Sequence, residues 1–342
     1  ASMGKTGTQS IGDHMWRTLY SPVSYGDKNA LIPTQLGNDK IKWESTVQKD
    51  LGLDFSFMRG RLGGTFGYYH KVTDGTLLNM TPAPSSSYST VVFNIAKIRN
   101  QGLEFDIHGD FIRKKDFRWT GSLNISRNVS KVLDINGGPF SDPNDRDALN
   151  LGTSVVKEGE PLGLLYGRVA TGIIKTQEQL EAAKEEFSLW TSFDPYLNLG
   201  DIAYEYENGS WKQDVIGHAT PDFFGGYTNT INWNRFTLTA LFTFSYGNDL
   251  IYQKDVSDSG MSSLANRGTR VLNHYSEDNT SSNRPRSMWG TTYMLSSLNV
   301  YDASYFKLKT LSLSYNLPES ICRKVRIKSA SVYGTATNVF TI

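Results

Sequence analysis

The sequence predicts an all-β protein whose strands form an antiparallel transmembrane β-barrel, and three observations support this prediction. Long stretches of the chain alternate apolar and polar residues, which matches the period of two along a β-strand. The 342 residues include 31 glycines and 12% aromatic residues, a composition that suits strands joined by turns. The alternating stretches occur in pairs with short turns, and much longer segments connect one pair to the next.

The clearest strand covers residues 235–247. Its even-numbered residues from Phe236 to Tyr246 are apolar, and its odd-numbered residues are Arg, Thr and Ser, apart from Leu241 and the glycine at its end. A strand that crosses a bilayer at a tilt needs about 9–11 residues. We therefore expect the even-numbered side chains to face lipid and the threonines to face the barrel interior.

The same alternation predicts four hairpins. Their paired strands are 41–57 with 61–73, 98–112 with 117–133, 222–233 with 235–247, and 302–317 with 325–340. Within 302–317 the apolar positions change from even to odd numbers, which predicts a β-bulge near Lys309–Thr310. The last hairpin is expected to turn around Pro318–Ser320, and residues 1–40 are interpreted as loop.

The connections between hairpins are long, above all residues 134–221 and 248–301. In a single meander all short turns lie at one end of the sheet and all long connections at the other. Outer-membrane barrels have short periplasmic turns and long outer loops, whereas most connections in soluble domains are short. We therefore expect one partial β-barrel domain, residues 1–342, in which these two segments are extracellular loops.

The longer of these loops contains one predicted helix. Thr176 and Gln179 have the spacing of a capping box, in which each side chain satisfies a backbone amide of the first helical turn. An apolar stripe then continues to about Leu189. The helix either packs against its own loop or binds a partner, and the sequence leaves both interpretations open.

The sequence contains no pattern of an enzyme, a cofactor site or a metal site. Its formal net charge is +1, so charge does not indicate a nucleic-acid partner. The five histidines are too far apart for a local metal motif, and no G-x-S-x-G, HExxH or CxxC occurs. The acidic residues between Asp201 and Asp214 lack the alternating ligands of an EF-hand loop. Cys322 is the single cysteine, so no disulfide forms within the chain.

Several strings, in order along nearly the whole chain, carry a family resemblance. Among them are residues 94–104, Gly200–Ile202, Pro221–Phe223 and, most strongly, Ser304–Lys309. Together they resemble the SusC/RagA family of TonB-dependent outer-membrane transporters. Residues 4–7 also fit the family, except that Thr8 stands where Asn is usual. The resemblance implies a 22-stranded barrel plugged by an N-terminal domain, with this chain as a later part of the barrel that lacks the plug, the early strands and the last strand or strands.

The resemblance also implies a function: import of large nutrients across the outer membrane of a Gram-negative bacterium. The cargo would be an oligosaccharide or, less commonly, a peptide. A SusD-like surface lipoprotein would close over the barrel, and TonB would supply energy through a region absent from this chain. Membrane lipid would surround the barrel. Five loop aromatics are candidates for stacking on the ligand, although packing of loop against loop would also explain them: Trp190, Tyr204, Tyr206, Trp211 and Trp289.

Two other functions remain possible from the sequence. Eight strands can close into a small barrel, which would make the protein an adhesin or a structural protein of the outer membrane. A soluble β-rich carbohydrate-binding module is the second alternative. The long loops and the family strings argue against the adhesin. The apolar stripe of residues 236–246 argues against the soluble module, whose strands would need polar outer faces.

Overall fold

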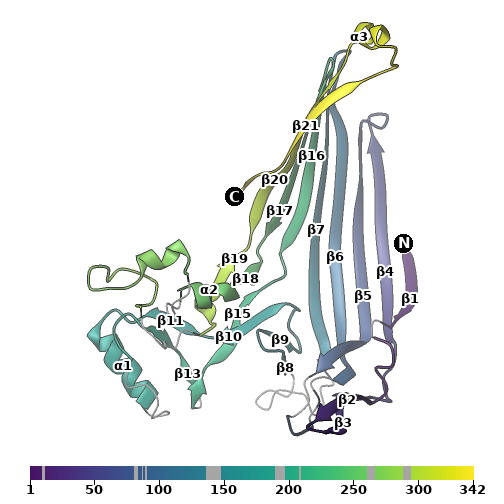
Figure 1. Cartoon of the computed structure of the whole chain (residues 1–342). Helices are drawn as coiled ribbons and strands as arrows, with labels where there is room; N and C mark the ends of the chain where they lie inside the picture. Colours follow the sequence, from purple (N-terminus) through teal and green to yellow (C-terminus); the bar gives the residue numbers. More distant parts are fainter. Residues whose placement is uncertain are drawn as a thin grey trace.

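The computed structural model describes residues 1–9, 12–80, 84–86, 88, 91–135, 148–188, 197–207, 209–259, 266–287 and 294–342. Its largest element is a nine-stranded sheet in which all neighbours are antiparallel (Figure 1). The strands follow in chain order: β1 (Ser2–Thr8), β4 (Glu44–Phe57), β5 (Leu62–Met80), β6 (Val91–Arg113), β7 (Phe117–Ile135), β16 (Phe223–Trp233), β17 (Phe236–Tyr246), β20 (Tyr305–Asn316) and β21 (Ser331–Thr341). The sheet is an open wall with β1 and β21 at its edges, and it confirms the predicted antiparallel meander.

The two faces of this wall carry different side chains. Phe242 of β17 pairs with Tyr227 on one side and Leu308 on the other, and its ring centroid lies 5.4 Å from that of Phe306. Thr239, on the opposite face, pairs with Thr230 and Ser312. Apolar side chains therefore meet apolar ones across the strands, and hydroxyls meet hydroxyls.

The predicted β-bulge in β20 is confirmed. On β17, Leu241 pairs with Thr310 and the next residue, Phe242, pairs with Leu308. Lys309 is thus an extra residue without a partner on β17. The extra residue changes the phase of the alternation, so the even-numbered apolar residues before it and the odd-numbered ones after it share one face.

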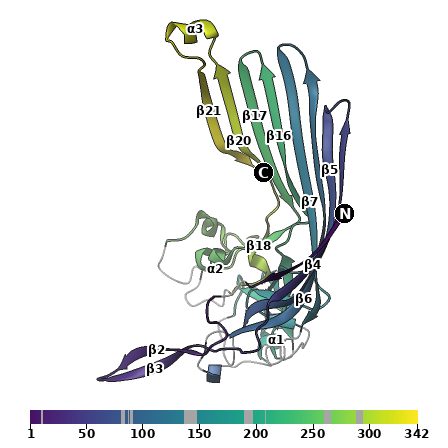
Figure 2. The same cartoon turned by 90° about the vertical axis from the view of Figure 1, so that its right-hand side faces the viewer.

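Short connections gather at one end of the wall and long ones at the other (Figures 1 and 2). At the short-turn end, the turn after β4 places Met58, Arg59 and Gly60 at positive φ. The prediction was wrong for the connection after β20. A short helix, α3 (Glu319–Lys324), follows Pro318 there, and β21 begins at Ser331 rather than Val325. The carbonyl of Pro318 accepts hydrogen bonds from the first amides of α3, and this local bonding outweighs the strand-like pattern that follows.

The interpretation of residues 1–40 as loop was also wrong. β1 is held to the edge of β4 by backbone pairing, with Lys5 opposite Val47, although its own residues show no apolar alternation. β2 (Leu19–Tyr25) and β3 (Lys28–Gln35) form a hairpin that extends away from the wall at the long-loop end (Figure 2). Gly26, at φ 60°, adopts the left-handed conformation that this tight turn requires.

The two long loops contain their own secondary structure, which we call the loop module (described residues of 148–221 and 248–301). The first loop holds β8 (Ala148–Asn150), β9 (Ser154–Lys157), β10 (Leu164–Arg168), β11 (Ala170–Ile173), α1 (Gln177–Ser188), β12 (Ile202–Tyr204), β13 (Tyr206–Glu207), β14 (Ser210–Trp211) and β15 (Gln213–His218). The second holds β18 (Asp249–Ile251), α2 (Gln253–Ser259), 3-10 turns at Thr269–Asn273 and Ser297–Asn299, and β19 (Val300–Asp302).

The predicted helix and its capping box are confirmed in α1. The Gln179 amide donates to the Thr176 hydroxyl at 3.2 Å, and the Thr176 amide donates to the Gln179 side chain at 3.1 Å. Leu180 is buried against Ile174 and Leu197. These contacts assign α1 a packing role within its own loop.

The two loops are joined by an ion pair whose carboxylate is buried. Arg286 of the second loop donates from Nε and Nη2 to the two carboxylate oxygens of Asp201 in the first, at 2.8 and 2.9 Å. The Arg286 amide also donates to the carbonyl of Gly200. A side chain at Gly200 would collide with the Tyr275 ring, and its φ of 86° is strained for other residues. The loops therefore form one body.

We predict that Arg286→Met loosens the loop module. The substitution leaves the Asp201 carboxylate buried without its partner, which costs about 3 kcal/mol. Hydrogen exchange of residues 197–205 and 274–287 in the full-length protein should accelerate about a hundredfold, as measured by mass spectrometry. Arg323→Met is the control because its pair with Glu319 is exposed and contributes little. Unchanged exchange in Arg286→Met would show that the pair does not hold the loops together.

Candidate functional site

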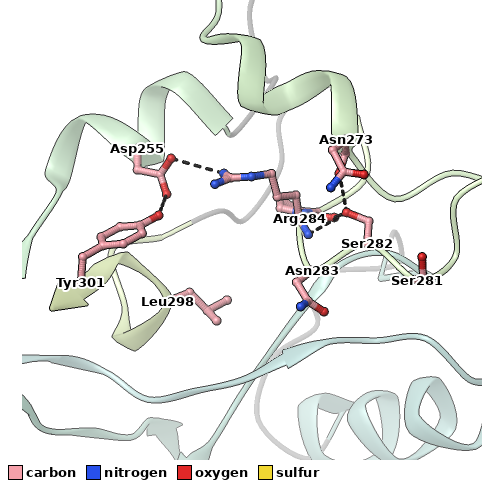
Figure 3. Close-up of a pocket in the computed structure, with 9 residues that line it drawn as sticks. Asp255, Asn273, Ser281, Ser282, Asn283, Arg284, Leu298 and Tyr301 are labelled. Carbon is pink, nitrogen blue, oxygen red and sulfur yellow. Dashed lines mark hydrogen bonds and ion pairs between the residues drawn. The ribbon is translucent and has the colours of Figure 1, made fainter. Parts of the chain in front are cut away.

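The loop module contains a cavity of about 270 Å³ built from four separate segments (Figure 3). Asp255 comes from α2, Asn273 from the 3-10 turn before the 281–285 segment, and Tyr301 from β19. The remaining lining residues are Ser281, Ser282, Asn283, Arg284, Pro285 and Leu298. Most of these side chains are polar, so the cavity offers hydrogen bonds rather than a purely apolar surface.

The cavity is lined on one side by the buried carboxylate of Asp255. Asp255 is 2% exposed, accepts a hydrogen bond of 2.7 Å from the Tyr301 hydroxyl, and lies 3.4 Å from Nη1 of Arg284. Burial, and after it the hydrogen bond to Asp255, raises the pKa of Tyr301. The phenol therefore stays protonated at neutral pH and remains a donor. Asp255 and Arg284 neutralise each other, as the pairing of buried charges requires.

The rim of the cavity is more exposed and carries amides and hydroxyls. Asn283 accepts a hydrogen bond of 2.8 Å from Nζ of Lys175, which also donates to the Ser281 carbonyl at 3.0 Å. Leu298 provides an apolar side chain beside the Tyr301 ring (Figure 3). With its charged groups paired, such a cavity suits an uncharged ligand rich in hydroxyl or amide groups.

A second hollow, of about 360 Å³, lies on the polar face of the wall near the short turns. Arg118 donates two hydrogen bonds to Asp110, at 2.9 and 3.0 Å, and both side chains line it together with Thr120 and Thr230. Bidentate pairing is the stronger form of the arginine–carboxylate contact. Polar side chains therefore continue along this face as far as the short-turn end.

Of the five candidate aromatics, Trp190 and Trp289 lie outside the described residues. Tyr204 is 8% exposed and packs with Ile173, Ile202 and Tyr275, and this burial raises its pKa to about 12. Its hydroxyl accepts a hydrogen bond of 3.0 Å from the amide of Met294. In this structure Tyr204 is part of the core of the loop module.

The other two candidates lie together. Tyr206 on β13 and Trp211 on β14 pair across a small hairpin, with ring centroids 5.9 Å apart. The Arg168 guanidinium lies 5.6 Å from the centre of the Trp211 ring. Both rings are partly exposed, so a ligand-stacking role for Tyr206 and Trp211 stays a prediction with suitable geometry.

Sequence reasoning missed the cavity of Figure 3. Asp255 stands 29 positions from Arg284 and 46 from Tyr301, so no local spacing relates the three residues. Its residues also come from the long loops, where no regular alternation guides a prediction. Only the folding of the loop onto itself brings them together.

Two further properties concern metals and helices. Within the described ranges, no three His, Cys, Asp or Glu side chains gather as they would around a metal ion. Asp201 and Glu205, two of the acidic residues in the region compared with a calcium loop, are paired with Arg286 and Lys212. None of the described helices has the length and apolar character of a membrane span.

Comparisons with known proteins agree with this architecture. Residues 16–339 match the family described as TonB dependent receptor-like, beta-barrel. TonB-dependent receptor P3 of Formosa agariphila is 32% identical over the whole chain, and TonB-dependent receptor SusC of Bacteroides thetaiotaomicron is 35% identical over 41% of it. These alignments cover 34% and 15% of the relatives' own lengths. The named relatives are receptors, not enzymes.

A solved structure shows the same fold. The structure of the RagAB peptide transporter superposes with a TM-score of 0.79 and 23% sequence identity, covering 99% of this chain and 36% of that one. The chain spans about a third of the length of such relatives. The alternating wall, the long loops and these matches together establish that the chain belongs to the TonB-dependent receptor family, as part of its β-barrel.

Proposed function

We propose that the whole protein imports a large nutrient across the outer membrane of a Gram-negative bacterium. The observation that carries this proposal is the two-faced wall, with stacked aromatics on one face and hydroxyls, amides and charge pairs on the other. In a membrane barrel the apolar face contacts lipid and the polar face lines the interior. The family match over residues 16–339 supports the same assignment.

The same architecture supports our proposal for the orientation, and the family supports our proposal for the partners. We place the short turns in the periplasm and the loop module outside the cell, as in other bacterial outer-membrane barrels. The loop module would then meet the substrate and a SusD-like lipoprotein, while TonB would supply energy through a part of the protein outside this chain. The named SusC and RagAB relatives favour this pairing with a lipoprotein.

We favour an oligosaccharide as the substrate class. The loop cavity presents amides and hydroxyls, and its two charged residues, Asp255 and Arg284, are paired with each other. Partly exposed aromatic rings at Tyr206 and Trp211 offer flat surfaces of the kind that pack against sugar rings. A peptide is the alternative because the RagAB structure is that of a peptide transporter, although its 23% identity indicates shared fold only.

The adhesin or structural barrel is less favoured. That alternative needs a closed barrel of eight strands, whereas the wall has nine strands in line and two unpaired edges. A gene deletion separates the two functions. Deletion should abolish growth on at least one oligosaccharide or peptide in a panel of sole nutrients. Normal growth on the whole panel, together with lost surface attachment, would favour the adhesin.

We predict that Trp211→Ala weakens binding of the nutrient identified by that screen. Loss of one stacking ring should lower the affinity of the purified full-length protein about threefold to tenfold, measured by calorimetry. Trp43→Ala is the control because Trp43 is an exposed tryptophan outside the loop module. Equal affinities for wild type and Trp211→Ala would remove Trp211 from the binding surface without affecting the import proposal.

We also predict the sidedness of the barrel. Protease added to intact cells should cut within residues 134–221 or 248–301 and leave the turn Arg113–Asp116 intact. Fragments mapped by mass spectrometry identify the cut sites, and cells with a permeabilised outer membrane provide the control for access to the turn. Cleavage of intact cells only at Arg113–Asp116 would reverse the proposed orientation.

A further inference from the structure

Positive charge is concentrated at the short-turn end of the wall, which we define as residues 57–62, 110–118, 233–236 and 316–330. Eleven of the chain's 35 Lys and Arg residues lie here, but three of its 34 Asp and Glu residues: Arg59, Arg61, Arg113, Lys114, Lys115, Arg118, Arg235, Arg323, Lys324, Arg326 and Lys328 against Asp110, Asp116 and Glu319. The end therefore has a net charge of +8, although the whole chain has +1.

Most of this charge is not neutralised within the protein. Arg118 pairs with Asp110, Arg113 lies 3.8 Å from the same carboxylate, and Arg323 pairs with Glu319. Eight exposed basic side chains have no ion pair with a carboxylate among the described residues: Arg59, Arg61, Lys114, Lys115, Arg235, Lys324, Arg326 and Lys328. The surface thus presents uncompensated positive charge to its surroundings.

Exposed apolar side chains lie among these cations. They belong to all four turns of the short-turn end: Phe57, Met58, Phe111, Trp233, Phe236, Ile321, Val325 and Ile327. Large rings beside flexible Lys and Arg side chains are typical of the boundary between lipid tails and headgroups, where the cation reaches into the headgroup layer and the apolar atoms stay below it.

The segment around α3 shows this mixture most clearly. Ile321, Val325 and Ile327 are exposed apolar residues, and Lys324, Arg326 and Lys328 stand between or beside them. The segment projects from the end of β20 and β21 (Figures 1 and 2). A soluble anion would be attracted by the charge alone, but it would give no reason for the apolar side chains at the same level.

We infer that the short-turn end binds anionic phospholipid headgroups of the leaflet that it faces. This inference rests on the proposed outer-membrane location. Each Lys or Arg near an anionic membrane surface adds to the attraction, which falls off within a Debye length. A zwitterionic headgroup has no net charge and is therefore attracted much less by the eight basic side chains that have no carboxylate partner.

The test uses the full-length protein in detergent and a matched pair of variants. One variant, K114Q/K115Q/K324Q/K328Q, removes four exposed lysines from the short-turn end. The other, K28Q/K40Q/K42Q/K184Q, removes four exposed lysines from the long-loop end. Native mass spectrometry measures the affinity of each protein for cardiolipin and for phosphatidylethanolamine. A difference in gel migration between unheated and heated samples checks that each variant is folded.

The wild type should bind cardiolipin at least about tenfold more tightly than phosphatidylethanolamine. The short-turn variant should keep less than about a third of that preference, and the long-loop variant should keep nearly all of it. Equal affinities in the wild type, or equal losses in both variants, would overturn the inference. If the short-turn variant does not fold, the salt dependence of the wild type tests the inference instead. Its preference for cardiolipin over phosphatidylethanolamine should fall steeply between 0.15 M and 1 M salt, and an unchanged preference would overturn the inference.

Two further measurements distinguish failure of this inference from failure of the proposed membrane location. Soluble polyphosphate should compete weakly with cardiolipin, and full displacement at equal phosphate concentration would assign the surface to a soluble anion instead. Insertion into phosphatidylcholine vesicles tests the proposed location separately. A protein that inserts but shows no anionic preference refutes this inference alone, whereas one that stays in solution without detergent refutes the membrane function.

Discussion

The structure depends on one constraint: in the bilayer, where we propose that the wall lies, every backbone amide and carbonyl must find its partner within the protein. An antiparallel meander satisfies this requirement because each interior strand is paired on both sides, from β4 through β20. The period of two then separates the faces. Phe242, Tyr227 and Leu308 lie together on one face, and side chains with hydroxyl groups lie on the other. The bulge at Lys309 preserves that separation where the sequence changes phase, and both proposed lipid contacts, at the wall and at the short-turn end, depend on it.

The loop module meets a different requirement, because long connections outside the sheet need their own core. Tyr204, Tyr275 and Ile202 supply apolar packing, while the Asp201–Arg286 pair joins the two loops. The polar cavity at Asp255, Arg284 and Tyr301 forms only because these segments are fixed against each other. A ligand surface made from loops therefore depends on contacts that contribute nothing to the wall itself. This division lets the loops vary in sequence while the wall keeps its alternation.

The wall could be predicted from the sequence because alternation is a local signal, as at Phe236–Tyr246 and at the bulge in β20. The capping box at Thr176 and Gln179 is equally local. The same reasoning failed for β1, which is a strand because β4 offers an edge, and for α3, whose Val325–Ile327 continuation resembles a strand. It also failed for Asp255, Arg284 and Tyr301, which only tertiary folding brings together. Trp211 was identified by residue type, and its role is still a prediction.

The most direct measurement of the central claim is cysteine scanning along β17 of the full-length protein. Cysteines replace residues 237–245 one at a time after Cys322→Ser, and a water-soluble maleimide tests each position in reconstituted membranes. We expect labelling at the odd-numbered positions, which would face the aqueous interior, and protection at the even-numbered positions, which would face lipid. Labelling without a period of two, or protection of the threonine positions with labelling at Phe242 and Phe244, would contradict it.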